Sequence, residues 1–599
     1  MILKKNFIRL LPKDKFMKIN IWSRLISYSK NYKKNFVLMI VLIMSCGIIE
    51  GSMPFLSGWV IDNVIETGNL IMLKRISVIF IFVIILQVLS VYWFIYHAGK
   101  VESGMAYELR KNCFEKLQHL SLSFFDKNSP GTTLSKLTSD INRVCGTIAW
   151  GIIDYSWGLV MMLKLGTLMF IRSWKLALIT LAVMPLLFGG GFLFQKIIII
   201  KYRAVRKLNG IITGAYNEGI MGARTVKTLS QEDSSAKEFM NKTSDMRQRA
   251  IRAGIIGGIF FPFVGFMASI GTSLALWSGG VAVIEGGITY GLFVSFIFSS
   301  MQFFNPVFDM SQTFANLQYA RAAGERILDL LDTEEEIKDN KNIKSHGKIN
   351  GSIEFKNVSF SYIEDEKILK NFSIKINRGE TIALVGETGS GKSTIVNLAC
   401  RFYEPTEGVI LIDGKDYRDI SQKDLHSSLG YVLQSPYLFN ATIFENVKFG
   451  RLDATREEVI AACKEINAHE FIMSLEHGYD TKTGESGKLL STGQKQLISM
   501  ARAILADPSI FVLDEATASV DAESEVKIQR ATDRLLKGRT SFIIAHRLST
   551  VVHADRILVI EKGVVIEQGS HLELIELGGH YHKLYTNQFY EEKEAELLK

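Results

Sequence analysis

The chain has 599 residues, 47% of them hydrophobic, and a positive mean hydropathy of +0.16. This length predicts more than one domain, and this hydropathy argues against a wholly water-soluble protein. The formal net charge is +8, and residues 1–35 hold ten Lys or Arg against one acidic residue, Asp14, directly ahead of long apolar stretches. A basic flank before apolar segments is typical of a cytoplasmic surface beside a membrane. The charge therefore indicates a membrane and argues against nucleic acid as a partner.

The N-terminus does not fit a secretory signal peptide, because its basic segment is too long and no small-residue cleavage site follows the first apolar run. The five cysteines are scattered without CxxC spacing. We expect them to be small apolar fillers in a reducing compartment, with no disulfide or metal role. They are Cys46, Cys113, Cys145, Cys400 and Cys463.

Six apolar stretches occupy the first half of the chain, and each is near the roughly 20 residues that a helix needs to cross a bilayer. The links after the second and fourth stretches are long and polar, about fifty residues each. A basic N-terminus inside places these links and both chain termini in the cytoplasm. Their helical periodicity, broken at 128–131 and 214–222, predicts hairpins that project into the cytosol. The stretches span residues 36–60, 76–95, 148–171, 176–200, 254–283 and 290–308.

A change of pattern marks a second domain. The sixth stretch continues as a helix to about Leu331, and a charged linker, TEEEIKDNKNIKSHGK, follows it. Beyond residue 351 short β-branched strands alternate with helices, which predicts an α/β domain with a mainly parallel sheet. The strands are expected at 352–355, 381–386, 409–413, 431–434, 510–514 and 541–546.

The segment GETGSGKS fits the pattern GxxxxGK[ST] and lies between a predicted strand, TIALV, and a predicted helix. Its glycines let backbone N–H groups surround a phosphate. Lys392 would reach the β- and γ-phosphates of a nucleotide, and Ser393 would bind Mg²⁺. The expected nucleotide contacts are Gly386, Glu387, Thr388, Gly389, Ser390, Gly391, Lys392, Ser393 and Thr394.

A second motif, IFVLDE, consists of four apolar residues that end in two carboxylates, Asp514 and Glu515. A buried strand would deliver both to the carboxyl edge of the sheet, where α/β proteins bind ligands. We expect Asp514 to hold Mg²⁺ through its hydration shell and Glu515 to orient and deprotonate the attacking water.

The segment LSTGQKQ, residues 490–496, resembles the signature sequence of ATP-binding-cassette (ABC) proteins. The resemblance implies that Tyr362 stacks on adenine, and that Gln434 contributes to catalysis, to Mg²⁺ binding and to the interface with the membrane domain. It also implies that Lys392, Glu515 and the switch residue His546 are catalytic. Ser491, Gly493 and Gln494 would contact ATP, as would Asp521 in the dimer-interface loop after Ser519 and Val520. The loop TGESG, from Thr483, resembles one specific to exporters.

The resemblance covers the whole chain and implies a fold and an activity. The fold is an all-α, six-helix transmembrane domain of the ABC exporter type fused to an α/β P-loop nucleotide-binding domain. The activity is ATP-driven export of amphipathic small molecules, drugs or lipids, with Mg²⁺, by a multi-pass protein of the cell membrane that works with a second half-transporter. The implied boundaries are an elbow at 1–35, a membrane domain at 36–335, a linker at 336–350 and an ATP-binding domain at 351–590, with coupling helices in 123–131 and 214–229.

Other functions fit the sequence less well or stay open. The fused cassette and the TGESG loop argue against an importer, and intact Glu515 and His546 argue against a subunit that binds ATP without turnover. Peptide export stays open as an alternative. So does a heterodimer with unequal ATP sites, because Thr492 stands where the family signature usually carries the first of two glycines.

Three ionisable residues, Glu50, Asp154 and Lys164, fall in or near the apolar stretches. Such groups usually face a cavity or a partner. Glu50 could instead lie beyond the lipid on a long first helix, and Lys164 could snorkel to the outer surface. A structural role and a role in substrate binding therefore both stay open.

Overall fold

The computed structural model describes residues 21–339, 347, 349–363, 366–514, 522–544 and 551–587. By its internal contacts the chain divides into two compact units. The helical unit consists of Met1–His119 and Ser129–Thr333, and the α/β unit consists of Leu120–Asn128 and Glu334–Lys599. The short segment Leu120–Asn128 thus interrupts the helical unit in sequence but packs with the α/β unit.

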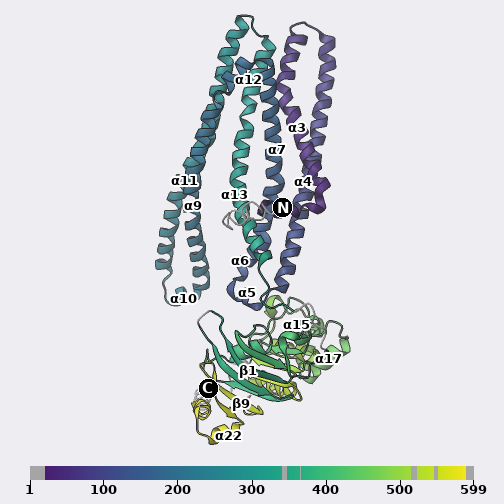
Figure 1. Ribbon diagram of the computed structural model, residues 1–599, viewed down its shortest axis with the longest axis vertical. Helices are drawn as coiled ribbons and strands as arrows, with labels where there is room; N and C mark the ends of the chain where they lie inside the picture. The colour runs from purple at the N-terminus through teal and green to yellow at the C-terminus, as the bar shows by residue number, and fades with distance from the viewer. Residues whose placement is uncertain are drawn as a thin grey trace, which may run out of the picture. The chain divides into compact units, whose positions relative to one another are not determined.

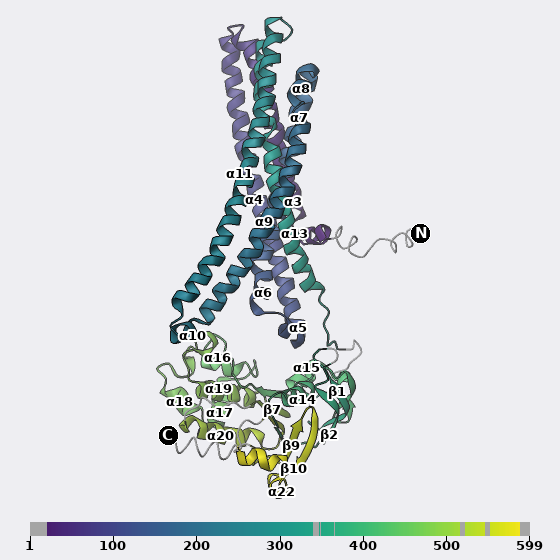
Figure 2. The same cartoon turned by 90° about the vertical axis from the view of Figure 1, so that its left-hand side faces the viewer.

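The helical unit contains six helices that are long and apolar enough to cross a membrane, as predicted. They run side by side in both views (Figures 1 and 2). Helices are the expected solution, because a bilayer offers no hydrogen-bond partner to backbone groups. Their parts are α3 (Lys33–Val60), η2 (Ile61–Ile65), α4 (Leu70–His119), α6 (Pro130–Ser135), η3 (Lys136–Asp140), α7 (Ile141–Arg172), α8 (Trp174–Leu181), α9 (Met184–Met221), α10 (Ala223–Thr228), α11 (Glu232–Ile284), α12 (Tyr290–Phe303) and α13 (Asn305–Asp332).

The two longest helices, α4 with 50 residues and α11 with 53, are far longer than a bilayer is thick, so the hairpins project beyond it. The break expected at 214–222 falls at the end of that range, because α9 continues through Gly214 and Gly219 and ends at Met221, before Gly222. Single glycines cost a helix about 1 kcal/mol each, which its backbone ladder tolerates. In the first hairpin, α5 (Leu122–Lys127) lies between two breaks.

The α/β unit contains the expected mainly parallel sheet, in the order β10-β9-β3-β8-β7-β6, with only β10 antiparallel. Its central strands are buried on both faces. The strands are β3 (Thr381–Val385), β6 (Leu429–Val432), β7 (Ile510–Asp514), β8 (Thr540–Ile544), β9 (Arg556–Glu561) and β10 (Val564–Gly569).

Two predicted strands do not belong to that sheet. Residues 352–355 and 409–413 fall largely in β1 and β4 of a separate antiparallel sheet, in the order β2-β1-β4-β5. Buried and exposed positions alternate along much of β2, which therefore presents only one face to the core, unlike the central strands of the parallel sheet. The strands are β1 (Ile353–Phe360), β2 (Leu369–Ile376), β4 (Glu407–Ile412) and β5 (Lys415–Asp416).

Short helices cover the parallel sheet and carry the loops of the candidate site. One core cluster joins the antiparallel sheet to one face of the parallel sheet, and a second lies against α19 and α20. The helices are α14 (Lys392–Ala399), α15 (Gln422–Ser427), α16 (Ile443–Lys448), α17 (Arg456–Glu465), α18 (His469–Ser474), α19 (Thr492–Leu505), α20 (Ala522–Leu536) and α22 (His571–Glu576).

All five cysteines are free thiols and buried, as expected of apolar fillers. The native cysteines should therefore react little when cysteines on the surface are labelled.

Topology gives the first prediction. A cysteine introduced at Glu66 or Glu285 should react with a membrane-impermeant maleimide in intact cells, because both positions are exposed and the basic N-terminal flank predicts that these helix ends face outward. A cysteine at Asn128 or Asp233 should react only after the cells are opened. The unsubstituted chain is the control, and labelling in the opposite sense would overturn the assigned orientation.

Candidate nucleotide site

A tight loop connects β3 to α14 and carries the GETGSGKS segment. Gly386 has a φ of +152°, and a Cβ there would lie 2.2 Å from the Ile560 carbonyl oxygen of β9. Only glycine fits so close to a neighbouring backbone. Gly391, with a φ of +108°, precedes α14 directly, so the loop ends at the N-terminus of that helix. Free N–H groups and the helix dipole favour an anion at this position.

Lys392 is 7% exposed and folds its side chain over the loop. Its ammonium donates to the carbonyl oxygens of Gly386 at 2.7 Å and Glu387 at 2.8 Å. Burial lowers the pKa of this ammonium, and the nearby charge of Asp514 opposes the shift. The loop therefore holds a partly desolvated cation at its centre, which suits a phosphate ligand.

Ser390 also indicates that this loop binds a phosphate. Its hydroxyl is buried and has no hydrogen-bond partner among the residues that the structure describes. An orphaned hydroxyl is costly unless a ligand or water satisfies it. A phosphate oxygen held by this loop fits that requirement.

The residues expected to hold Mg²⁺ are oxygen donors at or near the same edge. Asp514 is the last residue of β7, and Gln434 follows the neighbouring strand β6 by two residues and is exposed. Ser393, the second residue of α14, is also exposed. So sparse a donor set suits Mg²⁺, which keeps several waters and shares substrate phosphates. Glu515, Asp521 with its neighbours Ser519 and Val520, and His546 lie outside the described residues.

Tyr362 is held beside this loop by other aromatic rings. Phe360 and Tyr403 approach it edge-on, at centroid distances of 4.8 and 5.1 Å. Its hydroxyl donates to Thr394 of α14 at 3.3 Å, and the side chain stays 40% exposed. A ring fixed at its edges with open surface left over is suited to stacking on a base.

The signature segment begins α19. Ser491 is its N-cap: its hydroxyl accepts from the Gln494 N–H at 3.2 Å, and the Gln494 side chain accepts from the Ser491 N–H at 3.0 Å. A serine hydroxyl that accepts a bond still has its proton to donate. Thr492 is exposed in the first turn of α19, where a β-branched residue meets no backbone strain, and Gly493 beside it is buried.

Tyr403, which no motif of the sequence marks, connects the Tyr362 ring to α5. Its hydroxyl donates to the carboxylate of Asp126 in α5. Burial and this carboxylate both raise the pKa of Tyr403, so the hydroxyl remains a donor at neutral pH. The only sequence signal was the position of Tyr403, just after α14.

The linker residues Glu336 and Asp339 contact α5 and the segment that follows α14. Glu336 accepts hydrogen bonds from Ser123 and, at 3.5 Å, from Lys127, both in α5. Asp339 accepts from the Gln422 N–H at 3.0 Å and faces Arg401, whose side chain is almost fully buried. Arg401 and Tyr403 therefore tie the segment after α14 to the linker and to α5.

The first expected coupling segment, 123–131, overlaps α5, and its part up to Asn128 packs within the α/β unit. The second, 214–229, contains the end of α9 and α10, which belong to the helical unit. The loop that it forms is apolar and exposed at Ile220, Met221 and Leu229.

Known families match both halves of the chain. Residues 36–307 match the family described as ABC transporter transmembrane region, and residues 369–518 match the family described as ABC transporter.

Two curated relatives match nearly the whole chain. One is the ATP-dependent lipid A-core flippase of Syntrophus aciditrophicus (strain SB), 34% identical over 97% of this chain and 96% of its own length. Another is a putative multidrug export ATP-binding/permease protein, YgaD, of Bacillus subtilis (strain 168), 36% identical over 95% of this chain and 100% of its own. A solved structure of a bacterial Atm1-family ABC exporter with ATP bound matches with a TM-score of 0.80 at 26% identity, over 93% of this chain and 98% of that one.

Lys392 gives the second prediction. Lys392→Ala should weaken ATP binding at least about tenfold and lower turnover with it, because the ammonium meets the phosphates in both ground and transition states. Lys415→Ala, an exposed lysine on β5, is the matched control and should behave as wild type. Titration with a fluorescent ATP analogue and phosphate release measure the two effects. Unchanged affinity and rate in Lys392→Ala would remove the loop from the ATP site.

Proposed function

Because this chain belongs to the ABC transporter family, we propose that it is an exporter half-transporter that couples ATP hydrolysis to outward movement of amphipathic small molecules or lipids. The observation that carries the proposal is one chain that combines six spanning helices with a phosphate loop centred on buried Lys392. Export is favoured because the relatives named above are a flippase and a putative multidrug exporter.

ATP hydrolysis would use the residues at the carboxyl edge of the parallel sheet. Lys392 and the loop N–H groups bind the phosphates, and Tyr362 stacks on adenine. Ser393, Gln434 and Asp514 would hold Mg²⁺, which neutralises charge on the phosphates when bound. Glu515 is the general base that takes a proton from the attacking water, and His546 contacts the γ-phosphate.

A second half-transporter would complete each site. Ser491, Gly493 and Gln494 at the start of α19, with Asp521, are assigned to the ATP held by the partner. The free proton of the Ser491 hydroxyl and the first N–H groups of α19 suit a γ-phosphate. The proposal keeps both termini in the cytoplasm, the membrane domain at 36–335 and the ATP-binding domain at 351–590.

The test of hydrolysis is the third prediction. Glu515→Gln should keep ATP affinity within about threefold, because affinity comes from the loop and Tyr362, but hydrolysis should fall below about a tenth of wild type. Glu476→Gln, an exposed residue of the same unit, should hydrolyse ATP normally. If Glu515→Gln retains more than about a tenth of wild-type turnover, Glu515 is not the general base.

Coupling between ATP and the membrane helices gives the fourth prediction, and Tyr403 is its centre. Tyr403→Phe keeps the ring beside Tyr362 but removes the bond to Asp126. Basal hydrolysis should persist, whereas cargo-stimulated hydrolysis should fall at least about threefold. Asp126→Asn, which retains an acceptor oxygen, should be milder than Asp126→Ala.

The control for this prediction is Tyr479→Phe, which removes a hydroxyl bonded to His469 at 3.0 Å elsewhere in the α/β unit. The double variant Tyr403→Phe with Asp126→Ala should lose no more cargo-stimulated hydrolysis than either single variant. Both changes break the same hydrogen bond. Additive losses, or equal losses in Tyr479→Phe, would contradict a coupling role for Tyr403.

A heterodimer with unequal ATP sites is the second candidate, and Thr492 is the observation that favours it. On that candidate the site completed by Thr492 is weak, and the chain alone hydrolyses ATP poorly. A homodimer with a tolerated threonine is the alternative, and the strain-free first turn of α19 accommodates it.

The fifth prediction separates the two. If the sites are unequal, the purified lone chain should show little hydrolysis until a second cassette protein is added, and Thr492→Gly should raise its turnover at least about threefold. Vigorous, cargo-stimulated hydrolysis by the lone chain that Thr492→Gly leaves unchanged would establish the homodimer instead.

A further inference from the structure

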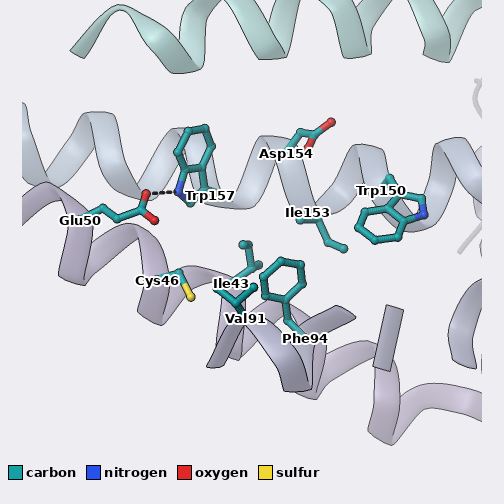
Figure 3. A pocket seen from close by; sticks show the side chains of 9 residues that line it. All are labelled: Ile43, Cys46, Glu50, Val91, Phe94, Trp150, Ile153, Asp154 and Trp157. Carbon is teal, nitrogen blue, oxygen red and sulfur yellow. Dashed lines mark hydrogen bonds between the residues drawn. The ribbon is translucent and has the colours of Figure 1, made fainter. Parts of the chain in front are cut away.

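A cavity of about 260 Å³ lies inside the helical unit, between α3, α4 and α7 (Figure 3). Aromatic side chains from two helices line it, Phe94 from α4 and Trp150 and Trp157 from α7. Most of the other lining is aliphatic or thiol, but two carboxylates also line it, those of Glu50 on α3 and Asp154 on α7, and Glu50 points toward Trp157 in this view.

Glu50 lies inside the first helix that is long and apolar enough to cross a membrane. It precedes Val60, the last residue of α3, by ten residues. At 1.5 Å per residue this is about 15 Å, or half of the roughly 30 Å hydrocarbon layer. Counted from Val60, where the expected apolar stretch ends, Glu50 falls near the middle of a bilayer's thickness.

The Glu50 carboxylate is held in position by neutral groups. Gln87 of α4 donates to one oxygen at 2.8 Å, and the Trp157 indole donates to the other at 2.7 Å. Within the described part of the chain Glu50 makes no ion pair. Lys164 packs its stem beside Gly51, where a Cβ would meet it at 3.2 Å, and its ammonium forms no ion pair with Glu50. A charge at this depth is expensive and usually has a partner of opposite charge.

The second carboxylate of the lining, that of Asp154, is bonded to another helix. Asp154 accepts a bond from Thr313 of α13 at 2.7 Å, and Figure 3 shows it turned away from Ile43, Val91 and Phe94. Glu50 therefore supplies a carboxylate to the lining that is not engaged by α13, and Phe94, Trp150 and Trp157 supply aromatic rings.

We propose that this cavity binds the cationic head of a lipophilic cation, with Glu50 as the counter-charge. Aromatic faces attract quaternary ammonium groups, and a carboxylate whose hydrogen-bond donors are neutral can pair with a cationic ligand. The inference rests on the proposed export function, whose cargo class it narrows. A trimethylammonium group has two sources, a free amphiphile or a choline lipid, and the test distinguishes them.

The experiment uses the purified full chain in a non-ionic maltoside detergent, with radiolabelled phenyltrimethylammonium as the probe in equilibrium dialysis. Saturable binding to one site per chain is expected. The matched competitor is tert-butylbenzene, which has the same shape without the charge and should not displace the probe. If tert-butylbenzene displaces the radiolabelled probe as well as unlabelled phenyltrimethylammonium does, the positive charge of the ligand plays no role in binding.

Glu50→Gln keeps an oxygen for the Trp157 indole and should weaken probe binding at least about tenfold. Asp309→Asn removes an exposed carboxylate of α13 outside the cavity and should change affinity by less than about twofold. Gel filtration and thermal unfolding confirm that each variant is folded. Wild-type affinity in folded Glu50→Gln, or equal losses in both variants, would overturn the site.

Two further measurements complete the test. If added phosphatidylcholine displaces the probe, the ligand is a lipid head; if it does not, the ligand is a free cation, and either result supports the cationic site. Hydrolysis of ATP is followed in the same samples. A chain that hydrolyses ATP but binds no cation overturns this inference alone, whereas a chain that binds the cation but never hydrolyses ATP overturns the export function.

Discussion

A bilayer gives the polypeptide backbone no hydrogen-bond partner, and the helical unit is the consequence of that constraint. Each crossing pairs its own N–H and C=O groups, so the membrane part of the chain consists of helices and leaves the phosphate chemistry to the α/β unit. The loops that bind phosphate need unpaired N–H groups, which only water-accessible segments such as Gly386–Gly391 can expose. The two kinds of chemistry are therefore separated along one chain and have to communicate.

We propose that this communication uses the segment that leaves the helical unit in sequence and packs with the α/β unit. The chain leaves α4 at His119, packs Leu120–Asn128 into the α/β unit and then returns to the helical unit. There the Asp126 carboxylate accepts a bond from Tyr403, whose ring meets that of Tyr362 edge-on. The linker residue Glu336 contacts the same helix, α5. Direct contacts thus connect Tyr362, the residue proposed to stack on adenine, to α5 and to the linker.

Features made by neighbouring residues could be predicted from the sequence, whereas features made by residues far apart in the sequence could not. The six spans and the phosphate loop depend on local composition and on spacings of a few residues, so the sequence reveals them directly. Strands such as β2 were missed because their alternating pattern is short and resembles a surface segment. The partners Tyr403 and Asp126 are 277 positions apart, and Glu50 and Trp157 are 107 apart. Such pairings are set by tertiary packing, which no local pattern records.

The most direct test of the account is uptake of a fluorescent amphiphilic dye into inverted membrane vesicles that contain this chain, with its partner chain if it has one, followed together with ATP hydrolysis. In these vesicles the α/β unit faces the added ATP. We predict that ATP drives accumulation of the dye, and that a non-hydrolysable ATP analogue drives none. ATP binding without hydrolysis or accumulation would contradict the account and indicate a protein that senses the nucleotide without pumping.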